Sequence, residues 1–149
     1  MLEQNGKIIG SELIGQNFSD EKYFHSRPSA AGDGYDAGNS SSSNLAPTSS
    51  DLLKTITART IELRSPDSSR KIPVDLVTAS GSGLDPDISV AGALYQTAHV
   101  AEARGLPVQQ VQGLVTQNIT PRDWGFLGEQ RVNVLNLNRA LDKLTSTVP

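Results

Sequence analysis

Cysteine is absent from this 149-residue sequence, and histidine and aromatic residues are scarce. Without Cys there can be no disulfide, no thiolate nucleophile and no thiolate metal ligand. His25 and His99 are the only histidines, which excludes a metal site built from several imidazoles. Aromatic residues make up 5% of the chain, so we expect a core of aliphatic side chains.

An excess of positive charge and long apolar runs are absent as well. The 13 Lys and Arg against 16 Asp and Glu give a net charge of −3, whereas nucleic acids attract a concentrated positive field. We therefore expect no nucleic-acid partner. No apolar run reaches the about 20 residues that cross a bilayer, and residues 1–15 lack the apolar centre of a signal peptide. The residues present predict a soluble domain.

Length and composition fit one domain over residues 1–149. The chain is long enough to bury a core of its own, and 36% apolar with 19% charged residues is typical of a soluble protein. Helical and strand-like segments follow one another without a strict βαβ order. This pattern predicts the α+β class, with a small mixed sheet and about three to four helices.

Periodicity and turn residues predict the individual elements. We expect one or two short strands in 7–18, a turn or short helix that carries Tyr23 and Phe24, and a helix over about 50–64 that residues 65–67 stop. A buried strand over 72–77, a loop over 78–87 and a helix over 89–104 ended by Gly105 should follow. Pro107 should open another helix that ends near Gln117, and 132–138 alternates as a strand does before a short helix or turn at 139–144.

Two loops are rich in glycine and serine. Residues 29–50 form a long segment of small and polar residues, and such a loop within a compact domain is uncommon unless it binds something or is disordered. We expect Asn44 to pin this loop through bonds of its side chain to the backbone. The second loop, at 80–83, follows an apolar run and precedes a helix.

The position of the second loop leaves several interpretations open. Backbone amides before a helix can hold a phosphate, but no Lys follows the glycines, and Asp85 and Asp87 place negative charge there. The alternative is a glycine turn that Asp85 or Ser89 caps. Asp75 with Asp85 and Asp87 could instead ligate a cation, although such loops normally gather more carboxylates at closer spacing.

Other polar and aromatic residues leave alternatives open. Arg27 either presents its guanidinium beside a rigid turn or pairs with a local Asp or a helix end. The asparagines of 132–138 either form a polar ladder or are the exposed positions of a strand. Trp124 is either a core plug or a contact patch. Ser and Asp are so numerous that the two histidines select no Ser-His-Asp set, and we identify no catalytic residue and no metal site.

Five blocks in the same order resemble one known family. They are GSELIGQNF at 10–18, YFHSRPSA at 23–30, SNLAPT at 43–48, PVDLVTASGSGLDPDIS at 73–89 and GFLGEQRVNVLNLNRALD at 125–142. Together they resemble the C subunit of the bacterial potassium-transporting Kdp ATPase over nearly the whole chain.

The resemblance implies an accessory, non-catalytic subunit of a high-affinity, ATP-driven potassium transporter. Its partners would be a channel-like subunit and the P-type subunit that hydrolyses ATP, whose ATP affinity it would raise as a catalytic chaperone. The family carries an N-terminal membrane helix, so this sequence looks like the extracytoplasmic domain of a single-pass inner-membrane protein, with that helix missing. Because such a domain cannot reach cytosolic ATP, we expect no cofactor of its own, and any effect on ATP must travel through the partner subunits.

The resemblance also supplies candidate residues for partner binding. Positions that match the family pattern are Arg27, Asn44, Asp75, Ser80, Gly81, Ser82, Gly83, Asp85 and Gln96, and we expect the polar ones to form a surface that docks on the channel-like subunit. The chain departs from the pattern at Ser41, Ser42, Asp87, Val90 and His99. Two alternatives to docking are direct nucleotide binding by 80–83 and a negatively charged cation filter made by Asp85 and Asp87.

Overall fold

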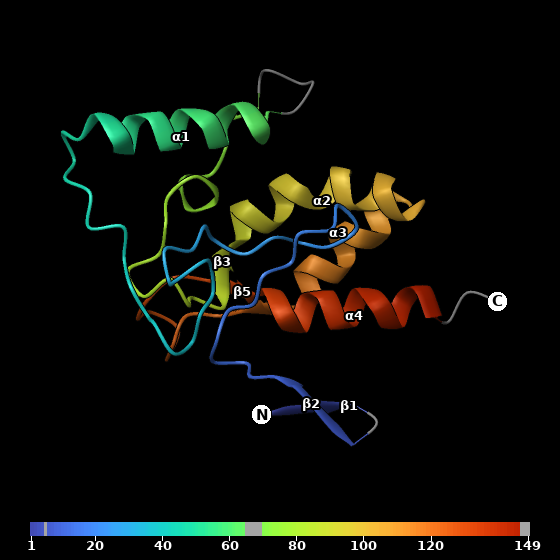
Figure 1. Ribbon diagram of the computed structural model, residues 1–149. Helices are drawn as coiled ribbons and strands as arrows, with labels where there is room; N and C mark the ends of the chain where they lie inside the picture. The colour runs from blue at the N-terminus through green and yellow to red at the C-terminus, as the bar shows by residue number, and fades with distance from the viewer. Residues whose placement is uncertain (5, 65–69, 147–149) are drawn as a thin grey trace.

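The computed structural model describes residues 1–4, 6–64 and 70–146 (Figure 1). Its elements, in chain order, are β1 (Leu2–Gln4), β2 (Lys7–Gly10), α1 (Ser50–Glu62), the 3-10 turn η1 (Val74–Leu76), β3 (Asp87–Ser89), α2 (Val90–Arg104), α3 (Val108–Gln117), β4 (Ile119–Thr120), β5 (Arg131–Asn133) and α4 (Val134–Ser146). The described residues thus hold four α-helices and two small antiparallel sheets. This arrangement confirms the expected α+β class.

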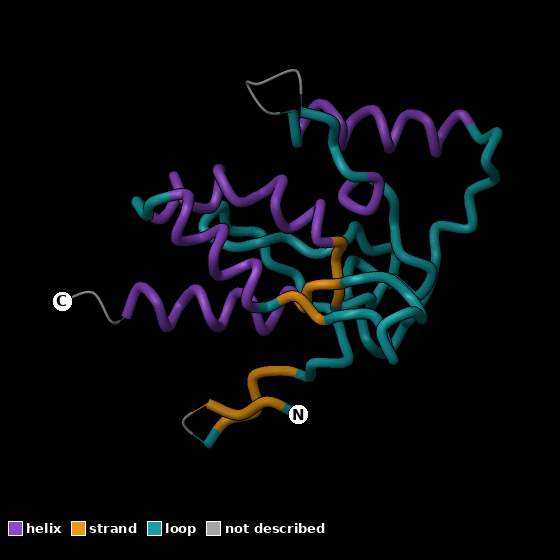
Figure 2. The backbone as a smooth tube through the Cα atoms, turned by 180° about the vertical axis from the view of Figure 1, so that it is seen from behind, coloured by secondary structure: helices purple, strands orange, loops and turns teal. Residues whose placement is uncertain are grey.

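The core lies where α2, α3 and α4 meet a three-stranded sheet. In that sheet the strand order is β3-β5-β4, and Ile88 pairs with Val132. The fully buried side chains are mostly aliphatic, as the composition predicts, and include Phe24, Val100, Val111, Val115, Val132, Leu137 and Leu141. Helix α1 and the β1–β2 hairpin lie on opposite sides of this unit in both views (Figures 1 and 2).

Local signals at the helix ends, which are serine caps in α1 and α2 and a proline in α3, explain why three of the helices were predicted well. The Ser49 hydroxyl accepts hydrogen bonds from two backbone N–H groups at the start of α1, and Ser89 caps α2 in the same way. Gly105, with φ of 63°, ends α2 in the left-handed conformation. Pro107, predicted as the first residue of this helix, takes the N-cap position of α3, which begins one residue later at Val108. The predicted stop at 65–67 lies outside the described residues.

Two predicted strands are wrong. The buried strand expected over 72–77 is the 3-10 turn η1 in a loop. The strand expected over 132–138 is cut short: β5 ends at Asn133, whose side chain accepts the N–H of Asn136 and so caps α4. The alternating letters of this segment also fit a helix, because positions 134, 137, 138 and 141 share one helical face and all are buried.

The remaining segments agree with the predictions in part. Only Lys7–Gly10 of the 7–18 segment is a strand, and it pairs with β1. The segment around Tyr23 is a turn, and its neighbour Phe24 is fully buried as an anchor. Residues 29–49 contain no helix or strand. No helix within the described ranges is both long enough and apolar enough to pass through a bilayer.

Candidate functional site

Arg27 and Asp85 join two segments that are distant in the sequence. The Arg27 Nη1 lies 3.1 Å from the Asp85 Oδ2, with the two side chains 27% and 32% exposed. The Arg27 Nη2 donates to the carbonyl of Ala79 at 3.4 Å, while its buried Nε has no hydrogen-bond partner among the described residues. Arg27 therefore pairs with an aspartate, although this aspartate lies 58 positions away and is not the local one that the sequence suggested.

The two glycine-rich loops lie against each other beside this ion pair. The Ser29 hydroxyl donates to the Gly83 carbonyl at 2.6 Å, and the backbone N–H of Ser41 donates to the Ser82 carbonyl at 3.0 Å. The Ser80 N–H reaches the Pro28 carbonyl at 3.2 Å, and the Ser80 side chain is buried. The loops are thus tied together mainly through backbone groups.

Gly83 is required where the loops touch. Its φ is +69°, and a Cβ built there would lie 2.7 Å from the backbone N of Ala31 and from the carbonyl oxygen of Ser41. Gly81, two residues earlier, has open space around it. The contact between the loops therefore depends on one glycine of the pair.

Asp75 holds the start of α2. Its Oδ2 accepts the N–H of Ser89 at 2.7 Å, and its Oδ1 accepts the Ser89 hydroxyl at 3.1 Å. That hydroxyl in turn accepts the Gly92 N–H at 2.8 Å. A carboxylate therefore already occupies the helix N-terminus, where the phosphate hypothesis would place an anion, and strand β3 separates the 80–83 loop from the helix. The geometry does not favour a phosphate site.

Gln96 works together with Asn138, which is buried and is not the exposed strand position or ladder member that the sequence suggested. The Gln96 amide accepts the N–H of His25 at 2.8 Å and donates to its carbonyl at 3.1 Å. Asn138 of α4 binds both backbone groups of the preceding Phe24, each at 2.9 Å. The two amides fix the segment that leads to Arg27. Helical spacing from Val134 to Leu141 would have marked Asn138 as buried.

Ser82 and Asn44 are the exposed members of the predicted set. The Ser82 hydroxyl accepts the N–H of Leu84. Asn44 has a φ of 51°, and its side-chain oxygen accepts the hydroxyl of Ser42 at 2.6 Å. This bond joins two side chains, whereas the sequence predicted bonds from Asn44 to the backbone. Of the seven predicted partner-binding residues, Ser80 and Gln96 are buried, Asn44 and Ser82 are exposed, and Arg27, Asp75 and Asp85 are half-buried.

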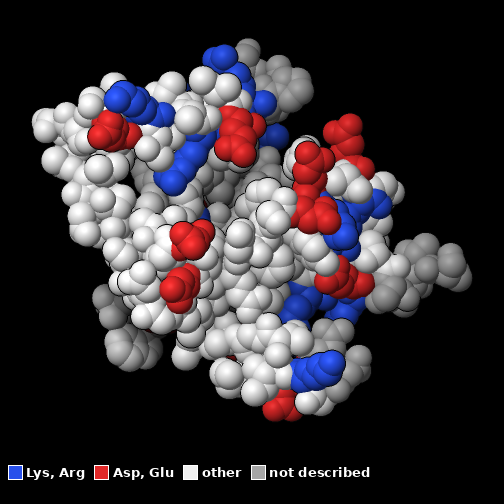
Figure 3. Space-filling view, viewed as in Figure 1, with Lys and Arg blue, Asp and Glu red and all other residues white. Residues whose placement is uncertain are grey.

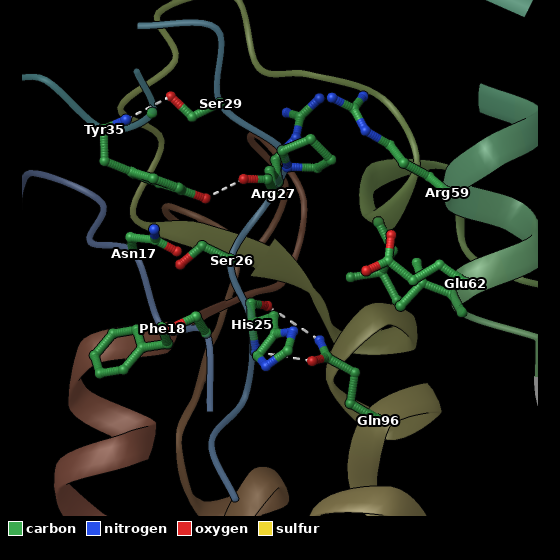
Figure 4. A pocket seen from close by; sticks show the side chains of 15 residues that line it. Asn17, Phe18, His25, Ser26, Arg27, Ser29, Tyr35, Arg59, Glu62 and Gln96 are labelled. Atoms are coloured by element: carbon green, nitrogen blue, oxygen red, sulfur yellow. Dashed lines mark hydrogen bonds between the residues drawn. The ribbon is translucent and has the colours of Figure 1, made fainter. Parts of the chain in front are cut away.

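A cavity of about 370 Å³ opens beside Arg27 (Figure 4). Tyr35 and Arg59 also line it, and neither was selected from the sequence because each reaches the cavity only through the tertiary fold. Burial raises the pKa of Tyr35 and lowers that of Arg59. The Tyr35 hydroxyl donates to the Arg27 carbonyl, and the Arg59 Nη1 donates to the Val77 carbonyl at 3.1 Å. Figure 4 shows the two guanidinium groups turned toward each other.

A second cavity, of about 340 Å³, is also bordered by Arg27 and is lined by Asp75, Asp85 and Asp87. Asp87 accepts from the Arg131 Nε at 3.2 Å and from the Asn133 amide at 3.2 Å, and burial raises its pKa. Each of the three carboxylates is therefore already engaged. In the part of the chain that the structure describes, no group of three acidic or histidine residues is placed to hold a metal ion.

Comparison with known proteins shows which family the chain resembles. A model of the K⁺-transporting ATPase c chain, KdpC, matches residues 1–143. Proteins named potassium-transporting ATPase KdpC subunit are similar to the chain. The one from Gemmatimonas aurantiaca is 56% identical over 151 aligned positions, covering 100% of this chain and 76% of that protein. Those from Acidobacterium capsulatum and Rhodospirillum rubrum are each 52% identical, covering 97% and 96% of this chain and 77% and 75% of their own lengths.

Proposed function

The chain belongs to the KdpC family, the c chains of K⁺-transporting ATPases, and from this membership we propose how it acts. As a family member it is an accessory subunit of a potassium transport complex and works in association with a membrane transporter.

We propose that the chain is non-catalytic and binds its partners through polar loops. It assembles with the channel-like subunit and with the subunit that hydrolyses ATP, and it raises the ATP affinity of the latter as a catalytic chaperone. The domain lies on the extracytoplasmic side of the inner membrane, anchored by one N-terminal helix. ATP binds on the opposite side, so the effect is a coupling free energy carried through the partner subunits.

The observation that carries this proposal is the Arg27–Asp85 pair between two loops that are tied to each other. Ser82 and Asn44 are exposed on these loops, and Arg27 and Asp85 are half-buried beneath them. A polar surface that is fixed before binding loses less conformational entropy on association. The described residues also support a recognition surface better than a phosphate or metal site. Asp75 already occupies the start of α2, and no group of three acidic or histidine residues among those described is placed to hold a metal ion.

The test is the KM for ATP of the complex assembled with variants of this chain. Arg27→Ala removes the ion pair and should raise that KM about fivefold or more, the lower range of allosteric couplings, with less of the chain retained in the complex. Lys54→Ala is the matched control, because it breaks the exposed Lys54–Asp51 pair on α1 and should leave the KM unchanged.

Two results would contradict the proposal. One is an Arg27→Ala complex with a normal KM for ATP and normal subunit content. The other is heat released when the chain alone is titrated with Mg-ATP at millimolar concentration, because direct nucleotide binding would then explain the effect.

A further inference from the structure

The connection between β4 and β5, residues 121–130, exposes three large apolar side chains. Trp124 is 84% exposed, Phe126 70% and Leu127 45%. We call residues 121–130 the hairpin tip. Trp124 is the only tryptophan of the chain and Phe126 one of three phenylalanines. A protein with so few aromatic residues therefore places two of them in water, at one turn.

The hairpin tip is held in one shape by its own bonds. The Asp123 N–H donates to the Leu127 carbonyl at 2.9 Å, and the Leu127 N–H donates to the Asp123 carbonyl at 3.0 Å. An ion pair between Arg122 and Glu129, at 2.6 Å, closes the base. Trp124 is kept at a φ of 50°, which is unfavourable for a bulky residue. Residues held in such sparsely populated conformations cluster at functional sites, so the backbone of Trp124 supports a functional contact at the hairpin tip.

The charges of the hairpin tip and of the chain indicate a protein partner rather than a lipid surface. Arg122 faces Glu129, and Arg131 lies 3.8 Å from Asp123, so the positive and negative charges around the aromatic residues cancel. The chain carries a net charge of −3, and Figure 3 shows acidic and basic side chains interspersed over the face in view. Anionic lipids select basic surfaces, whereas protein interfaces are enriched in Trp, Phe and Arg.

We infer that the hairpin tip is a docking element that inserts Trp124 and Phe126 into an apolar pocket on another subunit of the same potassium transport complex. This inference rests on the proposed function for the existence of a partner. It adds a second contact, separate from the Arg27–Asp85 region, in which apolar burial supplies the affinity. A preformed turn with two aromatic anchors loses little entropy when it binds.

The experiment is co-purification of the tagged chain with the other subunits of the transporter after co-expression. The double variant W124S/F126S should retain at least about tenfold less of the partner subunits, because central aromatic anchors dominate such interfaces. Trp124→Phe keeps an apolar aromatic ring and should recover most of the binding. Leu13→Ser is the matched control, since Leu13 is also 84% exposed but lies in a different loop. Thermal unfolding of each isolated variant should match the original chain, because these side chains are exposed.

Two co-purification results would overturn the inference: partner subunits retained by W124S/F126S at the original level, or Leu13→Ser losing as much as the double variant. The single tryptophan supplies another test. A blue shift of its fluorescence when the isolated chain meets vesicles of zwitterionic or anionic lipid would assign the hairpin tip to the membrane and also overturn it. These failures differ from failure of the proposed function, which appears as a KM for ATP that does not depend on the original chain.

Discussion

Gly83 is the residue at which the two glycine-rich loops have no spare room. Gly83→Ala forces a Cβ against the backbone of Ala31 and Ser41 at a positive φ. We expect it to lower the free energy of unfolding by about 1–3 kcal/mol, the cost of a strained backbone. Gly81→Ala, where the Cβ meets open space, should leave stability unchanged or raise it by up to about 1 kcal/mol. Urea unfolding of both variants measures the difference, and equal values would show that the loops do not touch as described.

Asp87 should make the stability depend on pH. Burial raises its pKa, so the Asp87 carboxyl contributes stability that is present below its unfolded pKa and is lost as the pH rises through the folded pKa. Asp87→Asn stays neutral at every pH. The stability of this variant relative to the original chain should therefore increase from about pH 3 to pH 6, around and above the usual Asp pKa of about 3.9. Urea unfolding over that range checks it, and a relative stability that falls with pH would show that the pair with Arg131 outweighs burial.

Single residues show which parts of the site the sequence can predict. The Ser49 and Ser89 caps involve neighbours within three residues, and local patterns predicted them. The Asn44 side chain instead bonds to the hydroxyl of Ser42, where the backbone was expected. The partners of Arg27 and Gln96 lie 58 and 71 positions away, so only the tertiary fold identifies them. Tyr35 and Arg59 went unselected for the same reason.

Helix α4 holds the segment before Arg27 through Asn138. Asn138→Ala leaves the buried N–H and carbonyl of Phe24 without the partners they have in Asn138. We expect a loss of about 2–6 kcal/mol, given about 1–3 kcal/mol for each of the two unsatisfied buried groups. The half-buried Asn136 of the same helix supplies the control, and Asn136→Ala should cost less than about 1 kcal/mol. Thermal or urea unfolding measures both. Equal effects would mean that the amide of Asn138 does not hold Phe24.

Helices with a serine or proline signal at their start were predictable, whereas short strands and a buried helix with polar residues were not. Helices α1, α2 and α3 begin and end close to the predicted residues. In α4 the asparagines at 136 and 138 alternate with apolar residues, as the polar positions of a strand do. Asn138 is nevertheless buried and hydrogen-bonded to another segment. The apolar residues of 72–77 predicted a strand, but Asp75 bonds to Ser89 and stabilises a turn there. Long-range polar contacts override local preference in both places.

The molecule as a whole consists of one packed unit and of segments that contribute little to its core. Helices α2, α3 and α4 and the three-stranded sheet form that unit. Helix α1 lies apart from it and has no fully buried residue among those described, and the hairpin tip exposes its aromatic residues. These features suit a subunit that completes its contacts in a complex, and they agree with the membership of the chain in the KdpC family.

The central claim is that the chain changes the ATP affinity of its complex by recognition alone. The most direct measurement is the KM for ATP of potassium-stimulated hydrolysis, with the complex assembled without this chain and again after the chain is added back. The account predicts a KM about fivefold or more higher without the chain, restored on addition, while the chain alone hydrolyses no ATP. An unchanged KM, or ATP hydrolysis by the isolated chain, would contradict it.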